Sequence, residues 1–428
     1  MVDASKFSGS TPFAQIKSLQ LGQTIRSDLR SITELPPQVP AHIDSNPIDL
    51  LTQKLSDTAR QFDSVYLSFS GGLDSSVIFY CLKQAGVPFT PFHGVSTIPY
   101  SENELAYATD VASHFGVTLQ LRSIESKHEQ FSFEPSAFTR IKYPTPFAVD
   151  IFARAPAETV DSRTCQPEPI RRLYLTGQGG DHVFLQNPGW NVGIDELLRL
   201  RIGKSLSQIS NYCRLKGDNL FRLLYRTARL AMHKQSYQKL LIHTPSWMSP
   251  RQKSQSGEWH YLLKHTDPRS AKYRHVSTIL AGLSGISLDR NTDHSTLHPL
   301  FLPDLIGTVL HRPIAELYTS EYDRIVLRNA AHQASGHSFA WRQTKRSSAS
   351  DYFSYFRNHL SAITRWLESG LLVKSLDIDF SKLRQSLEFN GNLYLNQDFS
   401  ALINLIQLEA YIQSMLHFSS ALRDSHEE

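Results

Sequence analysis

Short apolar runs alternate with longer amphipathic stretches through the first third of the chain. The runs have the length of buried strands and lie at 65–69, 88–95 and 117–121. Apolar residues at helical spacing, with terminal signals such as Asn46-Pro47 and Gly116, mark helices at 46–62, 77–85 and 101–115. A fourth strand, predicted at 171–176, continues the alternation. This order predicts an α/β fold with a doubly wound parallel sheet, in which ligands bind at the carboxyl ends of the strands.

Beyond residue 177 the pattern is mainly helical. Two helices are predicted within 195–239, separated near Gly217-Asp218, with amphipathic helices at 360–372 and 397–422. Many arginines and lysines fall between 199 and 234; solvated helix faces are the favoured interpretation, and a basic rim that guides a peptide or a partner is the alternative. We also expect a short helix at 144–154 and a loop at 246–260 that closes over a site.

Composition limits the possible classes of protein. Of 428 residues, 40% are hydrophobic and 20% charged, which is typical of a water-soluble globular protein. A net charge of +4 neither indicates nor excludes nucleic-acid binding. Cys81, Cys165 and Cys213 are widely spaced, so neither a disulfide framework nor a zinc site is predicted. No signal peptide or membrane span is visible, so we expect a cytoplasmic protein without stable membrane insertion.

The most specific motif follows the first strand. It reads Ser-Gly-Gly-Leu-Asp-Ser-Ser and comprises Ser70, Gly71, Gly72, Leu73, Asp74, Ser75 and Ser76. A glycine turn between a strand and a helix lets a phosphate approach backbone N–H groups, and the helix N-terminus adds about half a positive charge. The serines supply hydroxyl donors. Asp74 would repel phosphates unless a divalent cation lies between them, and Mg²⁺ is the usual ion for this role. The motif resembles the pyrophosphate loop of the ATP pyrophosphatases, which implies ATP as the ligand.

A second glycine-rich strand end follows residue 176. It comprises Gly177, Gln178, Gly179, Gly180 and Asp181. Alone, such a segment is equally consistent with a plain turn. Beside the first loop, however, it would place two carboxylates, Asp74 and Asp181, at neighbouring strand ends, where they could hold one magnesium ion. The end of the second strand, at His93, Gly94 and Val95, is the predicted adenine site.

The two loops together resemble the ATP pyrophosphatase domain of the asparagine synthetase superfamily. Two later segments are similar to family motifs: 322–330 to a Lys-x-x-Leu-Arg-x-Ala helix with Arg324 in the lysine position, and 341–347 to an Arg-x-x-Lys segment near the phosphates. The resemblance implies that Lys345 and Arg324 are catalytic cations. It also implies a catalytic role for position 178, where asparagine synthetases carry glutamate. Gln178 cannot act as a base near neutral pH, although it could orient a substrate.

Within the superfamily the chain looks most like the lasso peptide cyclases. The segment around His298-Pro299-Leu300 resembles their helix, and Ser295 and Leu297 replace the Glu and Arg of the asparagine synthetase pattern. The resemblance implies that ATP adenylates an Asp or Glu side chain of a core peptide, and that the N-terminal amine of the peptide then closes a macrolactam. A leader peptidase and a leader-recognition protein are the implied partners, and no nucleic acid is expected.

The resemblance also divides the chain. Residues 45–365 form the expected synthetase domain, 366–428 form helices that pack on it, and 1–44 replace the usual glutaminase-like domain as a short segment without cysteine. Three other functions stay open. One is a ligase for a small acid, of the asparagine or β-lactam synthetase type. Another is an adenylate-forming RNA-modification enzyme, and the last is a non-catalytic nucleotide-binding scaffold.

Overall fold

The structure is a computed structural model. It describes residues 23–25, 32–34, 46–96, 102–124, 171–232, 245–248, 263, 266–284, 294–343, 349–375, 378–387 and single positions between 402 and 416. The predicted helix at 144–154 and most of the predicted loop at 246–260 lie outside the described residues. None of the described helices is both long and apolar enough to cross a membrane.

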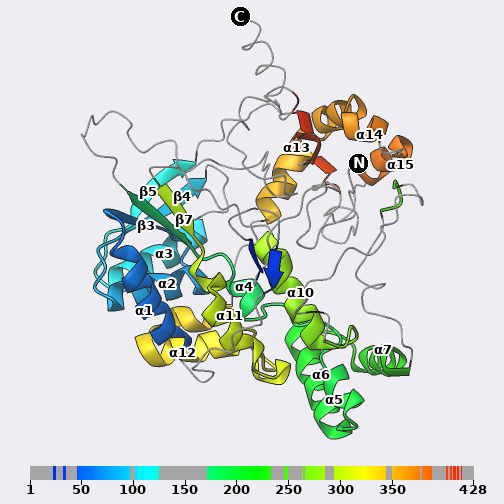
Figure 1. The fold of residues 1–428 in the computed structure, drawn as a ribbon, viewed down its shortest axis with the longest axis horizontal. Coiled ribbons are helices and arrows are strands. Elements are labelled where there is room, and N and C mark those ends of the chain that lie inside the picture. The colour runs from blue at the N-terminus through cyan, green and yellow to red at the C-terminus, as the bar shows by residue number, and fades with distance from the viewer. Residues whose placement is uncertain are drawn as a thin grey trace, which may run out of the picture.

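A parallel sheet of five strands organises the fold, which confirms the predicted fold class (Figure 1). Its order is β5-β4-β3-β6-β7, with β3 at Ser64–Ser68, β4 at Thr90–Ser96, β5 at Gln120–Ile124, β6 at Arg172–Thr176 and β7 at His294–Leu297. Successive strands proceed from β3 through β4 to β5 on one side, while β6 and β7 extend the other. The order therefore reverses between β3 and β6, and a crevice at the carboxyl ends of these two strands is the expected ligand site.

Helices follow the strands as the apolar pattern predicts. The helices of the sheet region are α1 at Pro47–Ala59, α2 at Leu73–Gln84, α3 at Glu102–His114, α11 at Pro303–Leu310 and α12 at Ile325–Ser335. The predicted start of α2 at Val77 was wrong, because the helix begins four residues earlier with Gly72 as its N-cap. As a result, Asp74 lies in the first helical turn. The strand predicted at 117–121 is displaced to β5, three residues further on.

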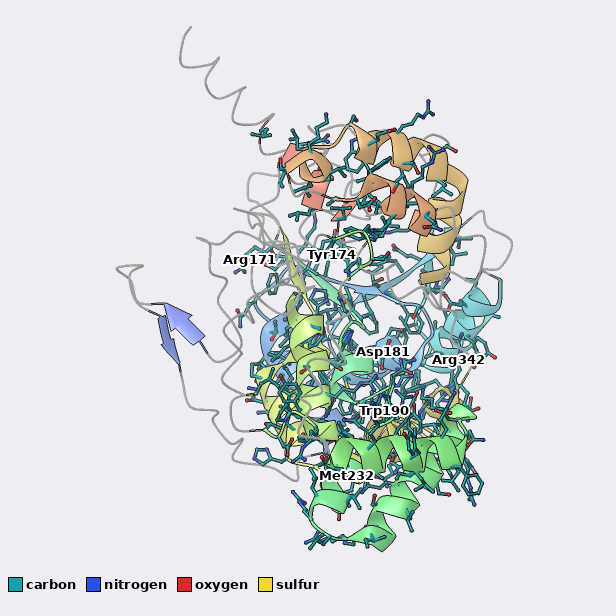
Figure 2. All side chains as sticks on the ribbon, turned by 90° about the vertical axis from the view of Figure 1, so that its right-hand side faces the viewer. Arg171, Tyr174, Asp181, Trp190, Met232 and Arg342 are labelled. Carbon is teal, nitrogen blue, oxygen red and sulfur yellow. The ribbon has the colours of Figure 1, made fainter. Side chains whose placement is uncertain are left out.

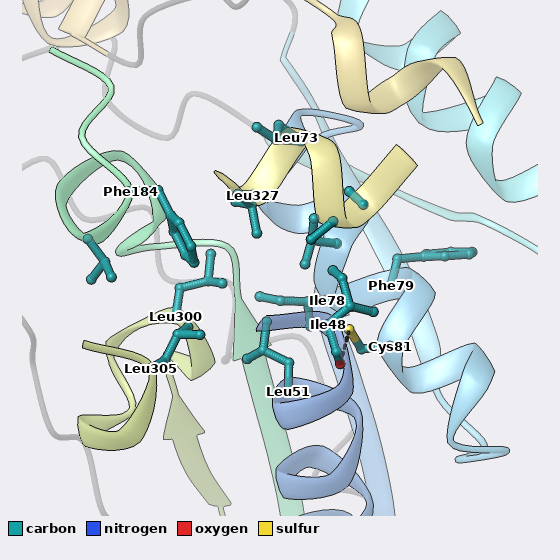
Figure 3. Close-up of a cluster of buried hydrophobic side chains, with 14 of the residues drawn as sticks. Ile48, Leu51, Leu73, Ile78, Phe79, Cys81, Phe184, Leu300, Leu305 and Leu327 are labelled. Carbon is teal, nitrogen blue, oxygen red and sulfur yellow. Dashed lines mark hydrogen bonds between the residues drawn. The ribbon is translucent and has the colours of Figure 1, made fainter. Parts of the chain in front are cut away.

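The main core joins these helices to the sheet (Figure 3). Fully buried side chains from α1, α2 and α11 meet there, including Leu51, Ile78 and Leu305. The Cys81 thiol donates to the backbone oxygen of Ile48, which ties α2 to the start of α1. Because α2 is anchored along its length by this core, its N-terminal turn is held at a fixed position beside the end of β3.

Further helices lie away from the sheet. They are α4 at Gly180–Val183, α5 at Ile194–Leu198, α6 at Ile202–Lys216, α7 at Leu220–Met232 and α10 at Ala271–Ser284. The predicted break near Gly217 is confirmed by its left-handed φ of 65°. A second break was not predicted: Leu200, with a φ of 59°, separates α5 from α6. Two 3-10 turns, η4 at Pro299–Phe301 and η6 at Ser338–Trp341, flank the segment that carries α11 and α12.

A second core unites the C-terminal helices, α13 at Ala349–Glu368, α14 at Leu371–Ser375 and α15 at Phe380–Leu387. Buried Glu409 accepts hydrogen bonds of 2.7 Å from the amides of Leu371 and Leu372, at the N-terminus of α14. The helix predicted at 360–372 is broken at Gly370, which lies between α13 and α14. Helix α13 runs through the predicted boundary at 365, and the division into domains stays a prediction. Near the N-terminus, β1 at Gln23–Ile25 pairs antiparallel with β2 at Ile32–Glu34.

His275 makes the stability of this fold depend on pH. It is fully buried on α10, and its Nε2 lies 2.8 Å from the backbone oxygen of Val183 on α4. Burial lowers its pKa from 6.5 to about 4. Between these values the unfolded chain binds a proton that the folded chain excludes, so stability falls as the pH falls. The effect amounts to about 3 kcal/mol by pH 4.

We therefore expect the thermal unfolding midpoint to be lower at pH 5 than at pH 7. His275→Gln should reduce that difference, whereas the exposed variant His311→Gln should retain it. Differential scanning calorimetry at both pH values measures the effect. An equal pH dependence in His275→Gln and the wild type would contradict the assignment to His275.

Candidate active site

The first glycine loop connects β3 to α2 in the geometry expected of a phosphate loop. Gly71 has a φ of +68°, and a Cβ there would lie 2.5 Å from the backbone nitrogen of Ala108 on α3, so only glycine fits. The Ser75 hydroxyl lies 3.2 Å from the Ser70 hydroxyl and donates to the Gly72 oxygen. The Ser76 hydroxyl is buried and has no hydrogen-bond partner among the described residues. The serine hydroxyls and the backbone N–H groups at the N-terminus of α2 thus lie together as hydrogen-bond donors in this loop.

The second loop lies directly against the first. A Cβ on Gly177 would come within 2.8 Å of the Ser75 backbone nitrogen, and a Cβ on Gly180 would overlap the Asp74 carboxylate. The two loops follow β3 and β6, which pair in parallel register from Ser64 with Arg172 onward. The glycines therefore permit a contact that any side chain would prevent. The predicted juxtaposition of Asp74 and Asp181 is present in the structure.

Arg324 links the two carboxylates. Its Nη1 donates to Asp74 Oδ2 at 2.9 Å and Oδ1 at 3.1 Å, and to Asp181 Oδ1 at 2.6 Å. The side chains of Arg324 and Asp74 are 4% and 6% exposed, while that of Asp181 is 34% exposed. Burial alone would lower the pKa of the guanidinium, but Asp74, Asp181 and Asp323 outweigh burial and raise it. Arg324 therefore carries its charge permanently at the junction of the loops.

The backbone of Arg324 is strained to reach this position. Its φ of 52° is left-handed, a conformation that costs a residue other than glycine roughly 1–2 kcal/mol. Buried Arg328 stabilises the turn, because its Nε donates to the backbone oxygen of Asp323 at 2.8 Å. The same guanidinium donates to the oxygens of Ala340 and Arg342. Arg328 thus fastens the segment before α12 to the segment that follows η6.

Arg342 brings that later segment to the phosphate loop. Its Nη1 donates to the Gly71 oxygen at 2.9 Å, and its guanidinium lies 3.7 Å from the centre of the Tyr107 ring. Arg342 and Asp181 are both labelled in Figure 2. The motif that the sequence places at 341–347 therefore begins at the loop. Lys345, the predicted catalytic cation of that motif, lies outside the described residues.

His298 was not among the predicted site residues. It follows β7, and its Nδ1 lies 2.6 Å from the hydroxyl oxygen of Thr176 at the end of β6. The same hydroxyl accepts a hydrogen bond of 3.3 Å from the backbone N–H of Gln178, whose side chain is exposed. Burial lowers the pKa of His298 to about 4, so the imidazole is neutral at pH 7. The imidazole therefore lies beside position 178 with one of its two ring nitrogens unprotonated.

The end of β4 lies next to the end of β3, as predicted. His93 is buried, and its Nδ1 lies 2.8 Å from the Phe69 backbone oxygen. Its ring therefore ties the two strands together instead of facing a ligand through that nitrogen. Gly94 is exposed and Val95 partly exposed at the carboxyl end of the strand. An adenine contact at these two residues stays a prediction.

The donor set fits a magnesium ion that is shared with phosphates. Among the described residues no group of three or more His, Cys, Asp or Glu side chains could hold a metal. Mg²⁺, however, is commonly bound through one or two carboxylates with substrate phosphates and water completing the shell. Asp74 and Asp181 supply two such carboxylates beside the phosphate cradle. Arg324 neutralises one of their two negative charges, which leaves one for a metal ion.

Comparison with known families agrees with this site. The family model described as asparagine synthase matches residues 48–410, which include both loops and the Arg324 segment. The chain belongs to the asparagine synthase family. The match confirms the predicted family.

The chain is also similar to a bacterial microcin-processing protein. This asparagine synthase family chain is similar to the microcin J25-processing protein McjC of Escherichia coli, with 24% identity over 355 residues. The similar region covers 83% of this chain and 62% of McjC, so the chain spans less than two thirds of that protein. The glycine loops and the bridging arginine described above all lie in the part of the chain that matches the family.

Gly180→Ala tests the contact between the loops. The added methyl group would displace the Asp74 carboxylate, so we expect ATP-dependent pyrophosphate release to fall at least 100-fold while the chain stays folded. Gly203→Ala on α6 is the matched control, because a Cβ there meets no atom within 4 Å. A coupled pyrophosphate assay and thermal unfolding measure both effects. Wild-type release by Gly180→Ala would show that the loops tolerate separation.

Proposed function

We propose that the chain closes a macrolactam in a peptide, as a cyclase of the lasso peptide type. The acid is an Asp or Glu side chain of the core peptide, and the amine is the N-terminus of the same peptide. The observation that carries the proposal is the buried Arg324 bridge between the two family loops at the switch point of the sheet. The similarity to a microcin-processing protein supports a peptide as the substrate.

The first step would join the acid to AMP. An oxygen of the substrate carboxylate attacks the α-phosphorus of ATP, the bond to the β-phosphate oxygen breaks, and pyrophosphate leaves. The N–H groups of the Ser70–Ser76 loop and the N-terminus of α2 would stabilise the departing charge. Magnesium, held by Asp74 and Asp181, would supply charge neutralisation and align the phosphates. Arg324 holds the two carboxylates side by side, where they would bind the ion.

Lys345 would add a second cation at the phosphates. It is the third residue after Arg342, whose side chain donates to the Gly71 backbone oxygen of the loop. The resemblance of this segment to the Arg-x-x-Lys segment of the family supports this role for Lys345.

The second step would form the amide. The amine nitrogen attacks the acyl carbon, the bond to AMP breaks, and one proton must leave the nitrogen. Gln178 cannot accept this proton. We infer that His298 does so through Nε2, while Nδ1–H donates to Thr176. The two strand ends would thereby hold the base beside the position where related enzymes carry glutamate.

A ligase for a small acid is the second candidate. It shares both chemical steps and differs only in the acid and amine that it joins. Ser295 and Leu297, on β7 next to His298, stand in the positions of the Glu and Arg found in asparagine synthetases. Neither side chain carries a charge that would bind a free amino acid, and this favours the peptide. A core peptide, a leader peptidase, a leader-recognition protein and a cytoplasmic location remain parts of the proposal.

The proposal is tested by incubating the chain with ATP, Mg²⁺ and candidate linear peptides that carry a free N-terminus and an internal Asp or Glu. Mass spectrometry should show the loss of one water from a peptide, with release of AMP and pyrophosphate. Asp74→Asn and Asp181→Asn should each reduce pyrophosphate release at least 100-fold, whereas Asp304→Asn, at an exposed pair with Lys54, should not. Conversion of a small free acid to its amide, with peptides unchanged, would favour the second candidate.

His298→Gln separates the two steps. We expect amide formation to slow about 100-fold or more, the usual contribution of a general base, while ATP–pyrophosphate exchange stays within about twofold of wild type. Thr176→Ser keeps the hydroxyl and is the conservative control. Rapid-quench measurement of both steps distinguishes the outcomes. An equal loss in exchange and in amide formation would assign His298 to binding or folding instead of proton transfer.

A further inference from the structure

Helix α7 carries an exposed apolar stripe. Phe221, Tyr225 and Met232 are 80%, 66% and 75% exposed, although side chains of this size are usually buried. Exposed Ala228 lies between them in the same series. Figure 1 shows α7 away from the sheet, at the edge of the group formed by α5 and α6. The stripe is therefore distinct from the candidate active site.

The spacing of the stripe residues indicates which kind of partner surface would pack on them. Its four residues, Phe221, Tyr225, Ala228 and Met232, follow one another at intervals of four, three and four. That series repeats every seven residues and forms the seam of a helix that packs along another helix. The opposite face of α7, with Leu223, Thr227 and Leu230, is already buried in the protein. The stripe is thus a second packing face on a helix whose first face is occupied.

The charged residues beside the stripe indicate the charge that a partner should carry. Arg222 and Arg229 each follow a stripe residue and lie seven positions apart, so both flank the same side of the seam. The residues on the other side, Leu224 and Ala231, are uncharged. Residues that flank a seam select partners by charge, and two arginines select acidic residues. Arg222 is 63% exposed at its side chain even though it pairs with Asp218, so it can contact a partner.

Two other occupants fit less well. A second copy that packs its α7 antiparallel across a two-fold axis would set arginines against arginines, which costs free energy. A lipid surface suits an apolar face with basic residues on both of its borders, whereas here arginines border the stripe on one side and Leu224 and Ala231 border it on the other. We propose that α7 is a docking surface for an acidic amphipathic helix of a partner protein. The partner packs its apolar seam on this stripe and its acidic residues against Arg222 and Arg229.

A synthetic helical peptide of three heptads tests the surface, with leucine at the seam positions and glutamate at the flanking positions. Fluorescence anisotropy measures its binding to the full chain. We expect Phe221→Ser combined with Tyr225→Ser to weaken binding at least tenfold, and Arg222→Glu combined with Arg229→Glu to do the same. The latter variant should gain binding of the matched peptide with lysine at the flanking positions. Arg60→Glu combined with Arg214→Glu makes the same charge change elsewhere and should bind like wild type.

Thermal unfolding checks that each variant is folded, and ATP–pyrophosphate exchange should be unchanged because the stripe is separate from the active site. Failure of the acidic peptide to bind, or equal binding by all variants, overturns the proposal. Binding to phosphatidylglycerol vesicles that depends on Phe221 and Tyr225, without peptide binding, would assign the stripe to a lipid surface. A dimer in analytical ultracentrifugation that these variants abolish would assign it to a second copy. Both results also overturn the proposal.

Discussion

One guanidinium nitrogen between two carboxylates holds the candidate active site together. Asp74 and Arg324 are both buried, and removing one partner of such a pair usually costs about 3–5 kcal/mol because the other charge is left unpaired. This ion pair offsets the strain of the left-handed Arg324 backbone. It also sets the distance between the phosphate loop and the second loop. The glycines of both loops, the turn before α12 and the support from Arg328 all serve to place these three charges.

The sheet creates the site for this ion pair. Strands β3 and β6 are neighbours although a long segment separates them in sequence, and each ends in a glycine loop at the same edge. The order of strands reverses at that point, so no crossover helix covers the crevice between them. His298 at the end of β7 and Gly94 at the end of β4 extend the same edge. The candidate binding residues for a nucleotide, an acid and an amine therefore all lie at the carboxyl edge of one sheet.

The parts of this arrangement that were predictable are local in sequence. The glycine loops, the first strands and the break at Gly217 are each encoded by a few adjacent residues. The partner of Asp74 was not predictable, because Arg324 lies 250 residues away in the chain. Strand β7 was missed because it has four residues of mixed polarity, His294 to Leu297. The role of His298 depends on that strand, and the break at Leu200 has no glycine or proline to mark it.

The sequence separation of the three charges has a consequence for biogenesis. Asp74 and Asp181 leave the ribosome well before Arg324, which lies 250 and 143 residues after them. Until the arginine arrives, closing the two loops would bury an uncompensated negative charge. The amino-terminal strands can pair early, but the close approach of Asp74 and Asp181 beyond the ends of β3 and β6 stays unfavourable until Arg324 is made. The candidate active site can therefore be completed only late in translation.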